Sequence, residues 1–232
     1  MQSQSISRPL SRNKSMKSKV LTPVLWFLLG SLVFAISPSN AQNRWKYEEN
    51  KHYRTLPLAE NVRIENDKVE VLEVFAYSCN HCFNFESNLE VFEKNKASYI
   101  DFVRMPVVYS EGYKMHARIY YTAESLGILD SMHLEVFKAI HLDRKRLMNE
   151  KEIYELFEKH GISKNQFENR FRSFTVESKL NRAERLTKKY KIRSTPTLVI
   201  NGKFAANGPS IRTLEEMLSV TKELAQREYL KQ

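Results

Sequence analysis

The sequence predicts an α/β fold in which a block of helices interrupts a sheet. Residues 68–77 and 99–108 are short apolar runs rich in valine and aromatic residues, typical of buried strands. They flank an expected helix at 81–96, which makes a parallel strand–helix–strand unit. Residues 114–190 contain four helical stretches and no convincing strand. The Asn201-Gly202 pair then indicates a hairpin, followed by a final helix that Thr213 caps, so the chain returns to the sheet after the helical block.

Capping signals divide the helical block. Asn149 begins one helix, and Gly161 ends it in a left-handed cap. Ser163 forms a capping box with Gln166 at the start of the next helix. We expect three phenylalanines on one side of that helix: Phe167, Phe171 and Phe174.

The segment before the first buried strand is polar and weakly patterned, and we expect an irregular lead-in with a short strand near Tyr53–Leu58. No internal repeat or low-complexity segment divides the chain further. The predicted organisation is a signal peptide at 1–41, a lead-in at 42–67, a first part of the sheet domain at 68–113, an inserted helical domain at 114–178 and a second part of the sheet domain at 179–232.

Composition excludes several classes of protein. The chain has 232 residues and only two cysteines, which rules out a disulfide-scaffolded mini-protein and an all-cysteine zinc or iron–sulfur site. The net charge is +10, but the first 41 residues hold five bases and no acid, so the remainder carries +5. Without an arginine-rich run or a regularly basic helix face, no nucleic-acid partner is expected.

The N-terminus has the three parts of a secretory signal. A basic region ends at Lys19, an apolar region follows from Val20 to Ile36, and the small residues Ser39 and Ala41 suit cleavage after Ala41. An uncleaved membrane anchor is the alternative, although 17 apolar residues lie near the lower limit for a spanning helix. Export, with the periplasm as the expected destination, places the cysteines in an oxidising compartment where a disulfide persists.

The two cysteines form a C-x-x-C motif, Cys79-Asn80-His81-Cys82, where a predicted strand ends and a helix begins. The helix dipole and unpaired N–H groups favour a thiolate on Cys79, and a nearby His81 imidazole would add to this. A low thiol pKa makes a good leaving group and an oxidising disulfide. A structural disulfide, half a zinc site with His81, and a pair of inert core thiols are the alternatives.

Four segments resemble the DsbA-type thiol–disulfide oxidoreductases of bacterial envelopes. Residues 71–86 (VLEVFAYSCNHCFNFE) resemble the active-site segment of that family, and residues 194–204 (STPTLVINGKF) resemble its cis-proline loop and hairpin. Residues 126–141 and 161–171 resemble its inserted helical domain. The resemblance covers about residues 50–230 and implies a thioredoxin fold with an inserted α-helical domain.

The resemblance implies a role for each matching residue. Cys79 would be the sulfur that exchanges with substrate and Cys82 its buried partner, while Asn80 and His81 would tune the potential. Thr195-Pro196 would be the cis-proline loop, whose backbone pairs with an extended substrate. From the sequence alone, an ordinary trans turn proline is the alternative.

Glu73 lies inside a predicted buried strand, on one side with Val69, Val71, Phe75 and Tyr77. A buried acid is costly unless it is paired or protonated. The family resemblance places it beneath the disulfide, where it would exchange a proton with Cys82. The alternative is a strand-end carboxylate paired to a lysine. For His116 and His141 we expect structural or surface roles.

The function that these observations favour is an exported, monomeric dithiol oxidase that acts on reduced, unfolded client proteins. The resemblance implies reoxidation by a quinone-linked membrane partner of the DsbB type, with no metal or organic cofactor. Asn-His between the cysteines, in place of Pro-His, and Thr195 before the proline keep a disulfide isomerase or reductase open as an alternative. Residues 42–67 are too short for the dimerisation domain of isomerases. A peptide-binding chaperone with incidental cysteines is the third hypothesis.

Overall fold

The computed structural model describes residues 45–57 and 68–231. The predicted signal peptide lies outside the described residues, as do residues 42–44 and 58–67 of the predicted lead-in. The described residues belong to one compact unit. In these two ranges no helix is long and apolar enough to cross a bilayer.

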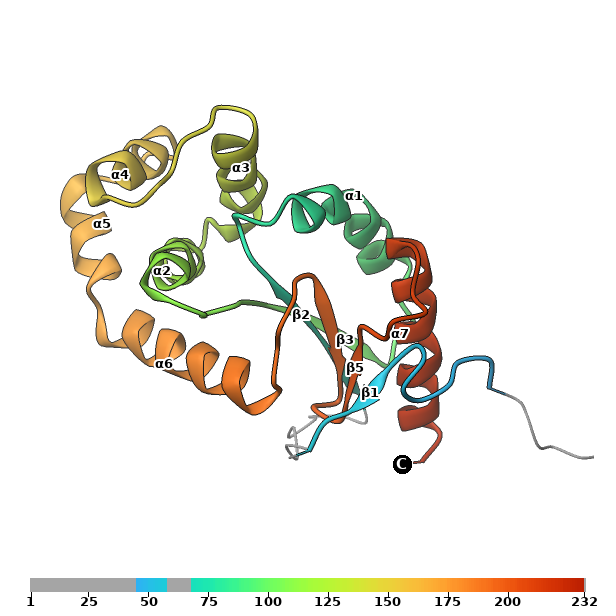
Figure 1. Ribbon diagram of the computed structural model, residues 1–232. Coiled ribbons are helices and arrows are strands. Elements are labelled where there is room, and N and C mark those ends of the chain that lie inside the picture. The colour runs from blue at the N-terminus through green and yellow to red at the C-terminus, as the bar shows by residue number, and fades with distance from the viewer. Residues whose placement is uncertain (1–44, 58–67, 232) are drawn as a thin grey trace, which may run out of the picture. The chain divides into compact units, whose positions relative to one another are not determined.

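A mixed sheet in the strand order β1-β5-β4-β2-β3 forms the centre of the described part (Figure 1). The two longest strands, β2 (Val69–Phe75) and β3 (Ile100–Pro106), pair in parallel, which confirms the predicted strand–helix–strand unit. β4 (Thr197–Ile200) pairs antiparallel with β2 and with β5 (Phe204–Ala206). The edge strand β1 (Arg54–Thr55) is the short strand expected in the lead-in.

Helices cover both faces of this sheet. On one face, α1 (Asn80–Asn95) and α7 (Leu214–Tyr229) bury apolar side chains against β2 and β4 (Figure 1). The helical block lies on the other face, over the side chains of Leu72 and Val74. Phe75 and Tyr77 belong to this second cluster and not to the face of Val69 and Val71, because helices of the block also surround the end of β2.

The helical block contains five helices where the sequence predicted four. They are α2 (Glu111–Ser125), α3 (Leu129–His141), α4 (Glu150–Lys159), α5 (Lys164–Phe171) and α6 (Phe174–Lys189). Gly127, with φ of 72°, separates α2 from α3. The side chain of Ser173 accepts a hydrogen bond from Val176 N–H and so starts α6.

This new start corrects the prediction for Phe174. It begins α6 and is 87% exposed, so it does not share a buried side of α5 with Phe167 and Phe171. The predicted boundary between residues 178 and 179 falls inside α6, and the predicted boundary at 114 falls inside α2.

The exposed side of α6 is basic, which the sequence analysis missed. Arg182, Arg185 and Lys188 are exposed along it, opposite buried leucine and alanine side chains. Lys188 pairs with Glu184 at 2.6 Å.

The other helix and turn signals are confirmed. Asn149 and Thr213 accept hydrogen bonds from the N–H groups three residues later, and Ser163 forms the predicted capping box with Gln166. Gly161 follows α4 with φ of 76°. Asn201 and Gly202 have φ of 51° and 60°, the left-handed pair that a tight turn between β4 and β5 requires.

Backbone hydrogen bonds join the lead-in to the sheet domain, next to a close contact at Gly208. Its N–H donates to His52 O at 2.9 Å, and Ser210 N–H donates to Lys51 O at 2.9 Å. A Cβ atom at Gly208 would lie 2.3 Å from Lys51 O, which is backbone and has little freedom to move. Glycine is therefore required at this position.

We predict that Gly208→Ala destabilises the protein by at least about 2 kcal/mol, because the methyl group forces two hydrogen-bonded segments apart. The matched control is Gly112→Ala, whose added methyl group would meet Met148 at an ordinary 3.6 Å. Urea unfolding followed by circular dichroism gives both values. Equal stability of the two variants would contradict the close contact.

Candidate active site

Cys79 occupies the N-cap position of α1. Its Sγ accepts a hydrogen bond from Cys82 N–H at 3.3 Å, and its own N–H donates to Ala76 O at 3.0 Å. The first turn of α1 contains no acidic residue that would offset the positive end of the helix dipole. Cys79 is half-buried, Cys82 is fully buried, and both are free thiols in this structure.

The two thiols differ strongly in acidity. A hydrogen bond from the Cys82 side chain, with further hydrogen bonds from the Thr195 side chain and from the backbone of Cys82 and His81, lowers the pKa of Cys79 to about 5 against the opposing effect of burial. Burial raises the pKa of the Cys82 thiol far above its ordinary value. At neutral pH the reduced pair therefore carries its negative charge on the accessible sulfur.

Residues from the far end of the chain complete the surroundings of Cys79. The Thr195–Pro196 peptide bond is cis, as the family resemblance implied. The Cys79 thiol donates a hydrogen bond to Thr195 O at 3.3 Å, across 116 residues of sequence. Pro196 is buried, and β4 begins at the next residue. The predicted substrate-docking loop therefore contacts the predicted nucleophile directly.

Asn80 and His81 lie in the first turn of α1 with exposed side chains. His81 lowers the pKa of Cys79 through its backbone N–H group. This contribution would remain if another residue with a backbone N–H replaced histidine. The effect of the imidazole itself stays a prediction.

Glu73 is completely buried in β2. Its partner is an arginine rather than the lysine considered above: Arg104, its neighbour on β3, places Nε 3.2 Å from Glu73 Oε2. The second oxygen, Oε1, has no hydrogen-bond partner among the described residues. Burial and the negative charge of Glu86 outweigh Arg104 and raise the pKa of Glu73 to about 8. Glu73 is thus protonated at neutral pH, and it lies near enough to Cys82 to affect its acidity.

Two histidines of α3, His133 and His141, contact the residues on either side of the cysteine motif, and the sequence predicted neither contact. His141 Nε2 lies 2.8 Å from Tyr77 O, and the His141 ring stacks on Phe83 with centroids 5.1 Å apart. His133 Nδ1 lies 2.9 Å from the Tyr77 hydroxyl. α3 therefore holds the chain just before Cys79 and just after Cys82. No local pattern reveals contacts between residues 56 to 64 positions apart.

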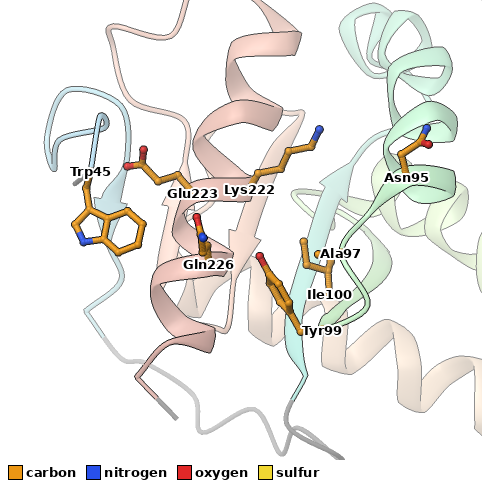
Figure 2. A pocket seen from close by; sticks show the side chains of 8 residues that line it. All are labelled: Trp45, Asn95, Ala97, Tyr99, Ile100, Lys222, Glu223 and Gln226. Atoms are coloured by element: carbon orange, nitrogen blue, oxygen red, sulfur yellow. The ribbon is translucent and has the colours of Figure 1, made fainter.

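A pocket of about 490 Å³ lies at the other end of α1 from the cysteines (Figure 2). Trp45 of the lead-in, Tyr99 beside β3, and Lys222 of α7 line it. None of the predicted site residues reaches this pocket. Within the described ranges, no group of three or more His, Cys, Asp or Glu side chains could hold a metal ion.

Comparison with known proteins now decides the family. A model described as the DSBA-like thioredoxin domain matches residues 104–219. The thiol:disulfide interchange protein DsbA of Azotobacter vinelandii is 30% identical over 209 residues, which cover 90% of this chain and 94% of that protein. The chain belongs to the DsbA family.

Solved structures of DsbA proteins agree with this assignment. The crystal structure of Pseudomonas aeruginosa DsbA matches with a TM-score of 0.74 and 29% identity, covering 80% of this chain and 96% of that one. The oxidoreductase NmDsbA3 of Neisseria meningitidis matches with a TM-score of 0.66 and 26% identity, covering 80% and all of that chain. The predicted thioredoxin fold with an inserted helical domain and the predicted thiol:disulfide oxidoreductase activity are confirmed, and the isomerase or reductase alternative is not favoured.

We predict that the Cys79 thiolate titrates with a midpoint near pH 5 and that Cys82→Ala raises this midpoint, because alanine removes the side-chain donor. Cys82→Ser keeps a hydroxyl donor and is the matched control, with a midpoint closer to wild type. Thiolate absorbance at 240 nm measures all three. The same midpoint in the alanine and serine variants would contradict this role of Cys82.

We also predict a pH-dependent loss of stability that originates at Glu73. Its folded pKa is about 8 and its ordinary value is 4.5, so the native state holds a proton that the unfolded chain releases between these values. The free energy of unfolding should therefore fall as pH rises from about 4.5 to 8, and level off above that. Glu73→Gln should reduce this fall, with a difference on the order of a few kcal/mol at pH 9. Urea unfolding across this range measures it, and parallel stability profiles for the two proteins would contradict it.

Proposed function

We propose that this chain is an exported dithiol oxidase that donates the Cys79–Cys82 disulfide to folding proteins of the bacterial envelope. The observation that supports it most is the unequal acidity of the two thiols. Hydrogen bonds stabilise the Cys79 thiolate of the reduced form. Stabilising the reduced form makes the disulfide easier to reduce, and so a stronger oxidant of other thiols.

The reaction begins with a client thiolate that attacks Cys79 Sγ of the disulfide. The S–S bond between Cys79 and Cys82 breaks, its electron pair leaves on Cys82, and Cys79 is joined to the client. A second client thiolate then attacks the client sulfur of this mixed disulfide and expels Cys79 as a thiolate. The client gains a disulfide, and the enzyme is reduced by two electrons.

Glu73 is the proton donor that we assign to the first step. Cys82 leaves as a thiolate in a buried position where the charged form is disfavoured. Glu73 is protonated at neutral pH and interacts electrostatically with Cys82, so it is suited to supply the proton. Arg104 then pairs with the Glu73 carboxylate that remains.

Thr195 and Pro196 form the client-docking edge in this proposal. Thr195 O accepts a hydrogen bond from Cys79, and Pro196 immediately precedes β4. An extended client segment that pairs with the backbone here would bring its cysteine to the exposed sulfur. Asn80 and His81, exposed beside Cys79, tune the potential of the pair.

The substrates in this reaction are reduced, unfolded client proteins. A membrane reoxidase of the DsbB type then reoxidises the cysteine pair and passes the electrons to quinone. The cleavable N-terminal signal would bring the protein to the periplasm, where it acts as a monomer. The cysteine pair is itself the redox group, so the reaction requires no metal or organic cofactor.

We predict a reduction potential well on the oxidising side of thioredoxin's, which is about −270 mV. Equilibration of residues 42–232 with graded glutathione buffers measures it. The oxidised protein should also oxidise a reduced two-cysteine peptide in a single turnover, and Cys79→Ser should abolish this reaction. A potential near that of thioredoxin, together with efficient refolding of a scrambled multi-disulfide substrate, would favour an isomerase or reductase. Peptide binding that persists without both cysteines and without redox activity would favour a chaperone.

A further inference from the structure

The buried side chain of His133 lies between Tyr77, just after β2, and Glu86 of α1. It lies on α3 and is 7% exposed. Its Nδ1 is 2.9 Å from the Tyr77 hydroxyl, and its Nε2 is 3.4 Å from Glu86 Oε1. Neither Nε2 nor Glu86 Oε1 has a hydrogen-bond partner among the described residues, so the contact between them is electrostatic and not a hydrogen bond. Two buried polar atoms therefore face each other, with the contact between them as their main compensation.

The Tyr77 contact determines which ring nitrogen of His133 carries the proton. Burial raises the pKa of Tyr77 well above its usual value, so Tyr77 keeps its hydroxyl hydrogen and is able to donate it to Nδ1. The proton of a neutral imidazole then resides on Nε2, directed at the Glu86 carboxylate. The opposite tautomer would place two lone pairs against each other.

Glu86 is coupled in turn to Glu73, because one arginine serves three carboxylates. Arg104 lies 3.2 Å from Glu73 Oε2, 3.4 Å from Glu93 Oε2 and 3.8 Å from Glu86 Oε2. The charge of Glu86 is, after burial, the largest factor that raises the pKa of Glu73. Any group that stabilises or frees the Glu86 charge therefore changes how tightly Glu73 holds its proton.

We propose that His133 is a positioning residue of the redox centre, which holds the Glu86 carboxylate and thereby controls proton binding by Glu73. His133, Glu86 and Arg104 also line a groove of about 950 Å³ beside α1. The use of this coupling in the reaction rests on the proposed role of Glu73, but the coupling itself is measurable without any client. The charged and titratable groups around Glu73 and His133 are Tyr77, Cys79, Cys82, Glu86, Glu93, Arg104, Tyr120 and Asp130.

The test is a titration of the Glu73 carboxyl group by carbon NMR in the reduced protein. His133→Leu removes the N–H group that faces Glu86 and partly neutralises its charge, so Glu86 repels a Glu73 carboxylate more strongly. We expect the Glu73 midpoint to rise by about one pH unit, a tenfold tighter hold on the proton. Tyr77→Phe keeps the aromatic ring at position 77 but removes the hydroxyl that faces His133 Nδ1, so either tautomer of His133 becomes available. This variant should raise the Glu73 midpoint by less. This second variant keeps the test decisive if His133→Leu does not fold.

A double-mutant cycle shows whether His133 acts through Glu86. Glu86→Gln alone should lower the Glu73 midpoint, because it removes a repelling charge. Adding His133→Leu or Tyr77→Phe to Glu86→Gln should then shift the midpoint no further. His116→Gln is the matched control, since His116 is a second buried histidine of the helical block that bonds instead to Arg146 O.

An unchanged Glu73 midpoint in folded His133→Leu or Tyr77→Phe would overturn the proposal. So would the same shift with and without Glu86, or an equal shift in His116→Gln. The measurement needs no oxidase activity. A protein that proved not to be an oxidase could therefore still show the predicted shift of the Glu73 midpoint. The pH profile of the Cys79/Cys82 potential gives a second readout, whose change of slope should follow the new Glu73 midpoint.

Discussion

The first turn of α1 is the constraint on which the redox chemistry depends. Cys79 caps the helix with its sulfur, which accepts a hydrogen bond from an N–H group of the first turn. The N–H groups that the helix start leaves unpaired are therefore the same groups that stabilise a thiolate. Cys82, three residues later, is carried into the core. A single helical turn therefore separates an acidic, accessible sulfur from a buried one that resists ionisation.

Burial disfavours the charged form of Cys82, and a second buried group, Glu73, lies near enough to affect the acidity of this thiol. A carboxylate in a central strand is a liability for stability, since burial opposes its charge and Arg104 is shared with two other acids. The arrangement keeps Glu73 protonated at neutral pH. Stability is given up at the position to which we assign the proton donor.

The helical block does more than cover one face of the sheet. α3 contacts the redox segment at Tyr77 and Phe83 through two histidines. Its position is therefore tied to the residues on either side of the cysteine motif. His133 also lies 3.4 Å from Glu86 of α1, so α3 contacts the helix that carries both cysteines.

Several parts of the fold follow from the sequence because their causes are local. Strand runs of valine and aromatic residues, the caps at Asn149, Ser163 and Thr213, and the turn at Asn201-Gly202 each depend on neighbours a few residues away. The break before Phe174 was missed, since Phe174 fits the three-to-four spacing of the preceding phenylalanines and only the Ser173 cap separates them. Local signals of similar strength compete there, and packing decides between them.

The sequence by itself determined that Cys79 and Cys82 lie three residues apart at a helix start, because both the spacing and the helix are local properties. It also identified Glu73 as a buried acid from strand alternation. Only the tertiary structure decided that Arg104, Glu86 and His133 surround that acid, and that Thr195 meets Cys79 across 116 residues. Charges act through space and are set by burial, whereas sequence patterns report only neighbours along the chain.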